Sequence, residues 1–212
     1  MQVRRLGRVG YQEALDLQAD LVEQRRRGDI GDTLLLLEHP PVITLGVKTR
    51  NNRTNIIASD AQLSGAGVTV FQTGRGGDVT YHGPGQLVGY PILDLNPHRR
   101  DVHKYVRDIE QALIEAVAVF GVSAGRVEGL TGIWVGQDKL AAIGVRISRW
   151  ITSHGFALNV STNLSHFDLI VPCGIQDRGV TALEHLLGRP VPMAEVESAV
   201  ETVFSRVFSP LE

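Results

Sequence analysis

The sequence predicts an α+β domain, in which β-strands and α-helices mix without a regular alternation. Helical periodicity is confined to three stretches, near the two ends and at the centre. Short apolar runs of strand length fill most of the middle of the chain and do not alternate with helices, which argues against a βαβ succession. No repeat or Ser/Pro-rich linker divides the 212 residues, so we expect one domain over residues 1–212.

The three helices are expected over residues 11–27, 102–120 and 193–207, where apolar side chains recur at helical spacing. Gly28 and Gly121 follow the first two and are typical helix stops. Two-residue turn chemistry in "GQDK" predicts a hairpin. The expected strands, in chain order, are "DTLLLLEH", "PVITLG", "VTVFQT", "LVGYPILDL", "GIWVG", "KLAAIGVRIS" and "ITSHGFALNV".

Charge and composition exclude several classes of protein. With 21 basic and 23 acidic residues, the net charge of −2 gives no reason to expect nucleic-acid binding. No window approaches the ~18 consecutive apolar residues of a membrane span, and the N-terminus has no apolar signal-peptide core. The single cysteine, Cys173, excludes an internal disulfide and a multi-thiolate metal site. We therefore expect a cytoplasmic protein with no membrane partner.

Glycine is unusually abundant, with 23 residues, and many of them fall in "GRGGDVTYHGPGQLVGYPI", residues 74–92. This stretch lacks the Lys-Ser/Thr of a P-loop, and Val79 occupies the third glycine position of a dinucleotide fingerprint. His82 has no partner histidine at a zinc-binding spacing. A strand-to-strand loop that offers backbone N–H groups, the Arg75 guanidinium and the His82 imidazole remains. A tight structural turn would use the same glycines, and the residues alone leave both interpretations open.

Cys173 lies in a second unusual segment, "LIVPCGIQDRGVTAL". A lone cysteine is commonly a small buried apolar residue, but a Pro-Cys-Gly turn would expose the sulfur and direct the Gly174 and Ile175 amides at a developing oxyanion. A nucleophilic thiolate also needs a nearby cation or base, for which His82 and Lys139 are the candidates. A hairpin lysine is usually solvated, and spacing does not bring it to Cys173. The residues predict a cysteine acyl-transfer site with an unidentified activator.

Four motifs together resemble one known family. "RGGDVTYHGPGQLVGYPI", "GIWVGQDKLAAIGVRI", "SHGFALNV" and "IVPCGIQDRGVTAL" are similar, in this order, to motifs of the lipoyl(octanoyl) transferases. The resemblance implies the biotin/lipoate protein ligase fold, a mixed β-sheet flanked by helices. It implies an acyltransferase that moves octanoyl, or lipoyl, from acyl carrier protein to a lysine of a lipoyl domain. The acceptors it implies are 2-oxoacid dehydrogenase E2 subunits and the glycine cleavage H protein.

The resemblance also implies the site residues. Cys173 would carry the acyl thioester, and Lys139 would lower its pKa and then serve as a base for the incoming amine. No cofactor, ATP or metal is implied, because a thioester donor already makes amide formation downhill. Asp78 is included by position, with no chemical role attached to its carboxylate. The implied substrate-binding residues are Arg75, Gly76, Gly77, Asp78, Val79, Thr80, Tyr81, His82, Ala142, Ile143, Gly144, Gly155, Phe156 and Ala157.

Three other functions would use parts of the same sequence. An ATP-dependent lipoate or biotin ligase shares the fold, but it forms an acyl-adenylate and needs no catalytic cysteine, so Cys173 favours the transferase. A non-catalytic acyl-binding module would need neither Cys173 nor Lys139. A cysteine protease is disfavoured because no Cys/His/Asn pattern of that kind is visible.

Overall fold

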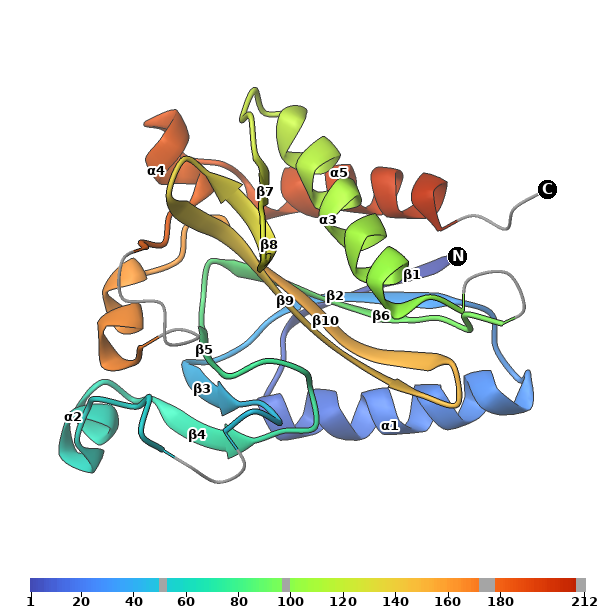
Figure 1. Ribbon diagram of the computed structural model, residues 1–212, viewed down its shortest axis with the longest axis horizontal. Coiled ribbons are helices and arrows are strands. Elements are labelled where there is room, and N and C mark those ends of the chain that lie inside the picture. Colours follow the sequence, from blue (N-terminus) through green and yellow to red (C-terminus); the bar gives the residue numbers. More distant parts are fainter. Residues whose placement is uncertain (50–52, 97–99, 172–177, 209–212) are drawn as a thin grey trace.

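The computed structural model describes residues 1–49, 53–96, 100–171 and 178–208. Its centre is a seven-stranded sheet in the order β1-β2-β6-β10-β9-β8-β7, with helices on both faces (Figure 1). β1 and β2 are parallel, and the other neighbours are antiparallel. This confirms the predicted α+β class with a mixed sheet. The strands are β1 (Gln2–Arg8), β2 (Thr33–Glu38), β6 (Gln86–Ile92), β7 (Gly125–Val127), β8 (Leu130–Val135), β9 (Asp138–Ser148) and β10 (Ile151–Asn159).

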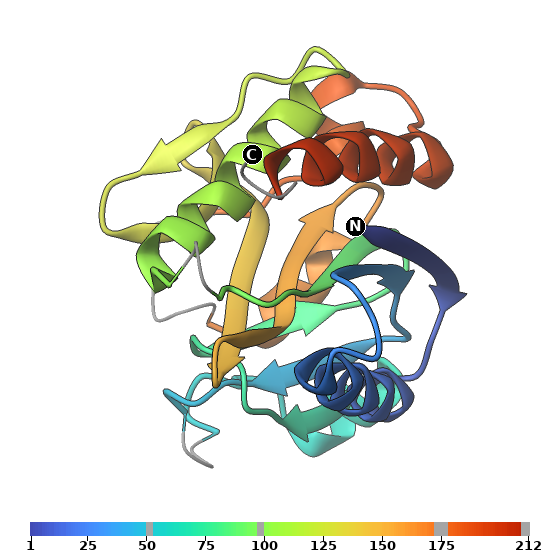
Figure 2. The same cartoon turned by 90° about the vertical axis from the view of Figure 1, so that its right-hand side faces the viewer.

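Three long helices cover the sheet, as the sequence predicted. α1 (Tyr11–Arg27) lies on one face, while α3 (Val102–Ala118) and α5 (Met193–Val207) cross the other face, and Figure 2 shows the sheet between these two layers. α1 ends at Gly28, whose φ of 80° is accessible to glycine without strain. The Asp101 side chain caps α3 by accepting a hydrogen bond from the Lys104 amide.

The sequence of β2 explains why it lies between these layers. Successive side chains of a strand point to opposite faces, so its four leucines divide between two cores. Leu34 and Leu36 pack with α3 and α5, whereas Leu35 and Leu37 pack with α1, and all four are fully buried. The continuous apolar run is therefore that of a strand covered on both faces.

A second, three-stranded sheet stands beside the first, in the order β4-β3-β5. Its strands are β3 (Val42–Leu45), β4 (Thr69–Gln72) and β5 (Val79–His82). β5 lies inside the glycine-rich stretch, so the prediction that this stretch is only a strand-to-strand loop was wrong. Periodicity missed it because four residues are too few to show alternation. The short elements α2 (Asp60–Gly65), η1 (Leu164–Leu169) and α4 (Leu183–Leu187), and the edge strands β1 and β7, were also not predicted.

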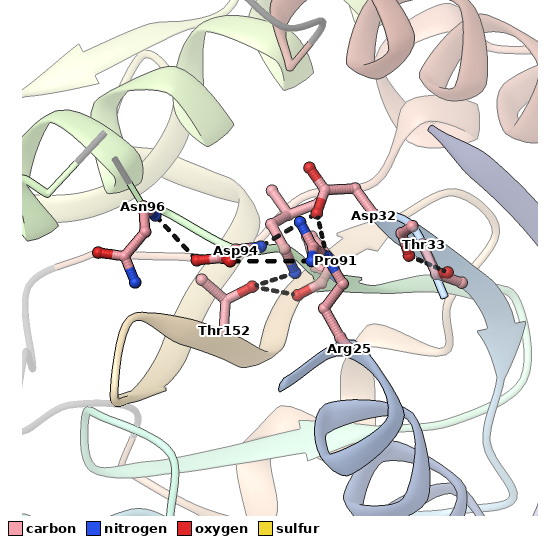
Figure 3. A network of polar contacts seen from close by, with 9 residues as sticks. Arg25, Asp32, Thr33, Pro91, Asp94, Asn96 and Thr152 are labelled. Carbon is pink, nitrogen blue, oxygen red and sulfur yellow. Dashed lines mark hydrogen bonds and ion pairs between the residues drawn. The ribbon is translucent and has the colours of Figure 1, made fainter. Parts of the chain in front are cut away.

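A polar network fastens the ends of these elements together (Figure 3). Arg25, in the last turn of α1, contacts Asp32 at 2.8 Å and Asp94 at 3.7 Å. The Thr152 hydroxyl donates to the Pro91 carbonyl and accepts from the Leu93 amide. The network therefore joins α1, the start of β2, the end of β6 and the start of β10. No helix in the described part of the chain is long and apolar enough to cross a membrane.

A buried carboxylate fastens α3 to the sheet. Glu110 is fully buried, and its side chain accepts hydrogen bonds from Arg107 at 2.6 Å and Arg126 at 3.0 Å. It also accepts a 3.0 Å bond from the Gly132 amide of β8. Removing the carboxylate leaves that buried amide without its acceptor, which is more costly than losing an exposed ion pair.

We expect Glu110→Ala to lower the free energy of unfolding by about 2 kcal/mol, because a buried donor and two guanidinium groups lose their partner. Glu115→Ala is the matched control, since Glu115 lies on the same helix and pairs with the exposed Arg206. It should change stability by no more than about 0.5 kcal/mol. Urea denaturation measures both. Equal effects of the two substitutions would contradict this account of Glu110.

Candidate acyl-transfer site

A cavity of about 520 Å³ lies against β9 and β10, beneath the glycine-rich stretch. The three predicted substrate-binding segments meet there although they are far apart in the sequence. Much of the wall is apolar, with Val106 of α3, Leu130 of β8 and Ile143, Val145 and Phe156 of the central strands. Of the predicted site residues, the lining includes Arg75, Gly76, Gly77, Asp78, Val79, Thr80, His82, Lys139, Ala142, Ile143, Gly144, Gly155, Phe156 and Ala157.

Tyr81 is the exception among the predicted substrate-binding residues, because it does not line the cavity. It is 1% exposed and packs with β3, η1 and the ring of Phe167. Its hydroxyl makes a 2.6 Å hydrogen bond with His166. Alternation along β5 places its side chain in this separate core, where it supports the small sheet.

Backbone contacts seat the glycine-rich stretch on β9. The Gly76 amide donates to the Val145 carbonyl at 2.8 Å. A Cβ on Gly144 would lie 2.8 Å from the Gly76 carbonyl oxygen, closer than real Cβ atoms approach. Glycine at position 144 therefore lets the loop lie directly on the strand and close one side of the cavity.

Arg75 organises this stretch from within. The residue is 7% exposed, and its guanidinium donates to the Thr44 hydroxyl and carbonyl and to the carbonyls of Gly76 and Asp78. The Asp78 carboxylate accepts bonds of 2.7 Å from the Val79 amide and from Asn55. Both charged side chains thus brace the loop.

Histidines and tyrosines gather at one part of the cavity. The His82 ring lies 5.9 Å from that of His39, which is far from it in the sequence. The two ring nitrogens of His39 form hydrogen bonds with the Val9 carbonyl and the Tyr90 hydroxyl, each at 2.7 Å. Among the described residues, no group of three or more potential ligands could hold a metal ion.

Burial keeps these imidazoles neutral. Desolvation lowers the pKa of His39 to about 4. Burial of the His82 ring lowers its pKa to about 3, with smaller contributions from electrostatic interactions with His39 and Arg75. Desolvation together with Arg75 and Arg146 lowers the pKa of His154 to about 4. At neutral pH all three rings therefore act as uncharged hydrogen-bonding groups.

His154 adopts a backbone conformation that is unusual within a strand. Its φ is 55°, in the left-handed region, and its amide donates to the buried Gln18 side chain of α1 at 2.8 Å. The side chain is buried, lines the cavity and meets the Tyr90 ring edge-on. Left-handed backbone at a non-glycine residue persists only where the surrounding structure holds it. α1 therefore helps to shape this part of the cavity.

Lys139 lies at the start of β9, where pairing with β8 shifts register between Ile133 and Trp134. Its ammonium lies 4.8 Å from the centre of the Trp134 ring, over which Arg178 also lies. The Lys139 amide donates to the Gly179 carbonyl, and its carbonyl accepts from the Thr181 amide, both at 3.0 Å. The fold thus brings residue 139 beside residues 179–181, a proximity that spacing could not predict. Cys173 lies outside the described residues.

The sequence analysis missed several polar residues of the lining, namely Tyr11, Lys48, Gln86, Tyr90, His154 and Asn159. A polar side chain inside an otherwise apolar strand was a usable signal for three of them. Gln86 begins β6, Tyr90 lies within it, and Asn159 ends β10. Tyr11 gave no such signal, since the first residue of an amphipathic helix is often aromatic for packing alone.

A mixed sheet with a largely apolar cavity, a glycine-rich stretch over it and a lysine in its lining characterises this α+β protein. The family described as "Lipoyl protein ligase A/B catalytic domain" matches residues 10–205. The chain belongs to this family.

Relatives of known sequence are similar over nearly the whole chain. An octanoyltransferase of Myxococcus xanthus is 56% identical over 97% of this chain, which spans 59% of that relative's length. One of Desulforamulus reducens is 50% identical over 97% of this chain and 90% of the relative.

Solved structures agree on the fold. Lipoate-protein ligase A bound with ATP superposes with a TM-score of 0.77 and 17% identity, covering 98% of this chain and 85% of that structure. A bipartite lipoate protein ligase from Thermoplasma acidophilum gives 0.71 and 15%, covering 98% and 84%. The predicted biotin/lipoate ligase-like fold is therefore confirmed.

The neutral histidines make stability pH-dependent. An unfolded histidine has a pKa near 6.5, so below that pH the unfolded chain binds protons that the folded chain does not. Stability is therefore lost as pH falls from about 6.5 toward 4. We expect His154→Asn, which tolerates positive φ, to reduce the slope of unfolding free energy against pH by about one proton between pH 6.5 and 5.

Urea denaturation across that pH range measures the slope. His103→Asn is the matched control because His103 is exposed on α3, and it should leave the slope unchanged. A slope in His154→Asn equal to that of the unsubstituted protein would show that His154 is protonated in the folded state.

Proposed function

We propose that this protein is an octanoyltransferase that moves an octanoyl group from acyl carrier protein to a lysine of a lipoyl domain. The observation that carries the proposal is the meeting of the three motif segments and Lys139 around one largely apolar cavity. The names of relatives at 50–56% identity support the same activity. E2 subunits of 2-oxoacid dehydrogenases and the glycine cleavage H protein are the acceptors we propose, with the cytoplasm as the compartment.

In the first step, the Cys173 thiolate attacks the thioester carbonyl of the donor. The new C–S bond forms as the bond to the carrier's sulfur breaks, and the carrier leaves as a thiol after taking up a proton. One thioester replaces another, so this exchange needs no ATP. A covalent intermediate divides the transfer into two steps and leads to ping-pong kinetics.

In the second step, the acceptor lysine amine attacks the acyl-enzyme carbonyl. A C–N bond forms, the C–S bond to Cys173 breaks, and one amine proton is released. Lys139 would act in both steps, first as an ammonium that stabilises the thiolate and gives its proton to the departing carrier thiol, and then, as the neutral amine, as the base that takes the proton from the acceptor lysine. Its position beside Gly179 and Thr181, in the chain that follows Cys173, supports this role.

The apolar walls would hold the eight-carbon chain. Burying methylene groups contributes about 0.8 kcal/mol each, so Ile143, Val145 and Phe156 can bind an octanoyl chain without a charged anchor. The glycine-rich stretch, braced by Arg75, would close over that chain. Its role is then to shape the cavity with backbone, while Arg75 itself keeps the loop in place.

We expect Cys173→Ser to lower octanoyl transfer by at least about 10³-fold, because the hydroxyl is not ionised at neutral pH. Lys139→Ala should lower it by about 10²-fold, the usual contribution of one acid–base group. Transfer from octanoyl-carrier protein to a purified lipoyl domain, without ATP, is followed by mass spectrometry.

Lys104→Ala is the matched control, since Lys104 is exposed on α3 and pairs with Asp108. Its transfer rate should equal that of the unsubstituted protein. Acylation of the lipoyl domain only when ATP and free octanoate are supplied would instead make the protein a ligase.

A further inference from the structure

Where β10 ends, residues 179–181 pair with the edge of β9 in its place. β10 pairs with β9 only as far as Leu158 opposite Ala141. Beyond that point, residues 179–181 bond to both the amide and the carbonyl of Lys139, and Val180 forms a parallel bridge with it. The position of the Lys139 backbone therefore depends on how residues 179–181 are themselves held in place.

Asn159 holds residues 179–181 in place. It is the last residue of β10 and is 4% exposed. Its side-chain amide donates to the Thr181 carbonyl at 2.9 Å. The residue also borders the cavity that Lys139 borders. The Asn159 side chain thus hydrogen-bonds to residue 181 at the point where the backbone pairing of β10 ends.

A second side chain fixes the orientation of Asn159. Gln86 is its cross-strand partner on β6, and the Gln86 amide donates to the Asn159 side-chain oxygen at 2.9 Å and to the Tyr81 carbonyl at 3.2 Å. Because both acceptors are oxygens, the Gln86 oxygen must face His82, whose Nδ1 lies 2.8 Å away and carries the proton. The donors therefore run in one direction, from His82 through Gln86 and Asn159 to Thr181.

We propose that Asn159 is a positioning residue for Lys139, which it holds through Thr181, and that Gln86 couples this anchor to His82 in the glycine-rich stretch. The proposal rests on the proposed function of Lys139 as the activator of the acyl-transfer thiol. The three side-chain links, from His82 to Gln86, from Gln86 to Asn159 and from Asn159 to Thr181, are buried hydrogen bonds, and loss of the Asn159 donor leaves the Thr181 carbonyl unsatisfied. Small displacements of catalytic groups reduce rates steeply.

The test is the pH profile of alkylation at Cys173, the only cysteine in the sequence, with iodoacetamide. We expect Lys139→Ala and Asn159→Ala both to move the profile to higher pH, and Asn159→Ala to make alkylation at pH 7 about tenfold slower. The kcat for octanoyl transfer should fall about tenfold or more while KM stays within about twofold, because the apolar side chains proposed to hold the acyl chain, those of Ile143, Val145 and Phe156, are unchanged.

Thr152→Ala is the matched control. It also removes two hydrogen bonds made by a buried side chain of β10, but at the other end of the strand, with Pro91 and Leu93 (Figure 3). Its alkylation profile should coincide with that of the unsubstituted protein. If Asn159→Ala does not fold, Gln86→Leu is measured instead, with a smaller shift expected in the same direction.

An alkylation profile for Asn159→Ala, or for Gln86→Leu, that coincides with that of Thr152→Ala would overturn the proposal. Alkylation needs no acyl donor, so it decides the positioning role separately from the function. If the unsubstituted protein forms no octanoyl adduct, the proposed function fails, and the comparison of alkylation profiles still decides whether Asn159 positions Lys139.

Discussion

The pairing of Gly144 with Gly155 between β9 and β10 is the constraint on which the cavity depends. A Cβ on Gly144 would lie 2.8 Å from the Gly76 carbonyl oxygen, and one on Gly155 would collide with the Gly89 carbonyl of β6. Glycine at position 144 therefore lets residue 76 lie directly on β9. Glycine at position 155 lets β6 lie close to β10. A side chain at either position would push apart the walls of the acyl cavity.

The electrostatics of the cavity follow from the same close packing. Burial keeps His39, His82 and His154 uncharged at neutral pH, and the Arg75 guanidinium is occupied in bracing backbone carbonyls. Lys139 stands apart from these groups, beside Trp134 at the start of β9. Under the proposed function, an octanoyl chain would lie along the apolar side chains of Ile143, Val145 and Phe156, while Lys139 would stabilise the thiolate.

The sequence predicted the parts of this arrangement that depend on local chemistry. Helical periodicity located α1, α3 and α5, and the motifs identified half of the residues that line the cavity. The sequence did not predict the features that depend on contacts between distant residues. Four residues of β5 are too few for a period, and the neighbours of Lys139 come from residues 179–181, forty positions later. Tyr81 belongs to the motif but does not line the cavity, because motif membership does not tell which way a strand residue points.

The most direct test of the account is the intact mass of the protein after mixing with octanoyl-carrier protein in the absence of ATP. The account predicts an added octanoyl group that hydroxylamine removes and that Cys173→Ser does not acquire, because the intermediate is a thioester. A protein whose mass stays unchanged, while a lipoyl domain is acylated only when ATP and free acid are present, would contradict it.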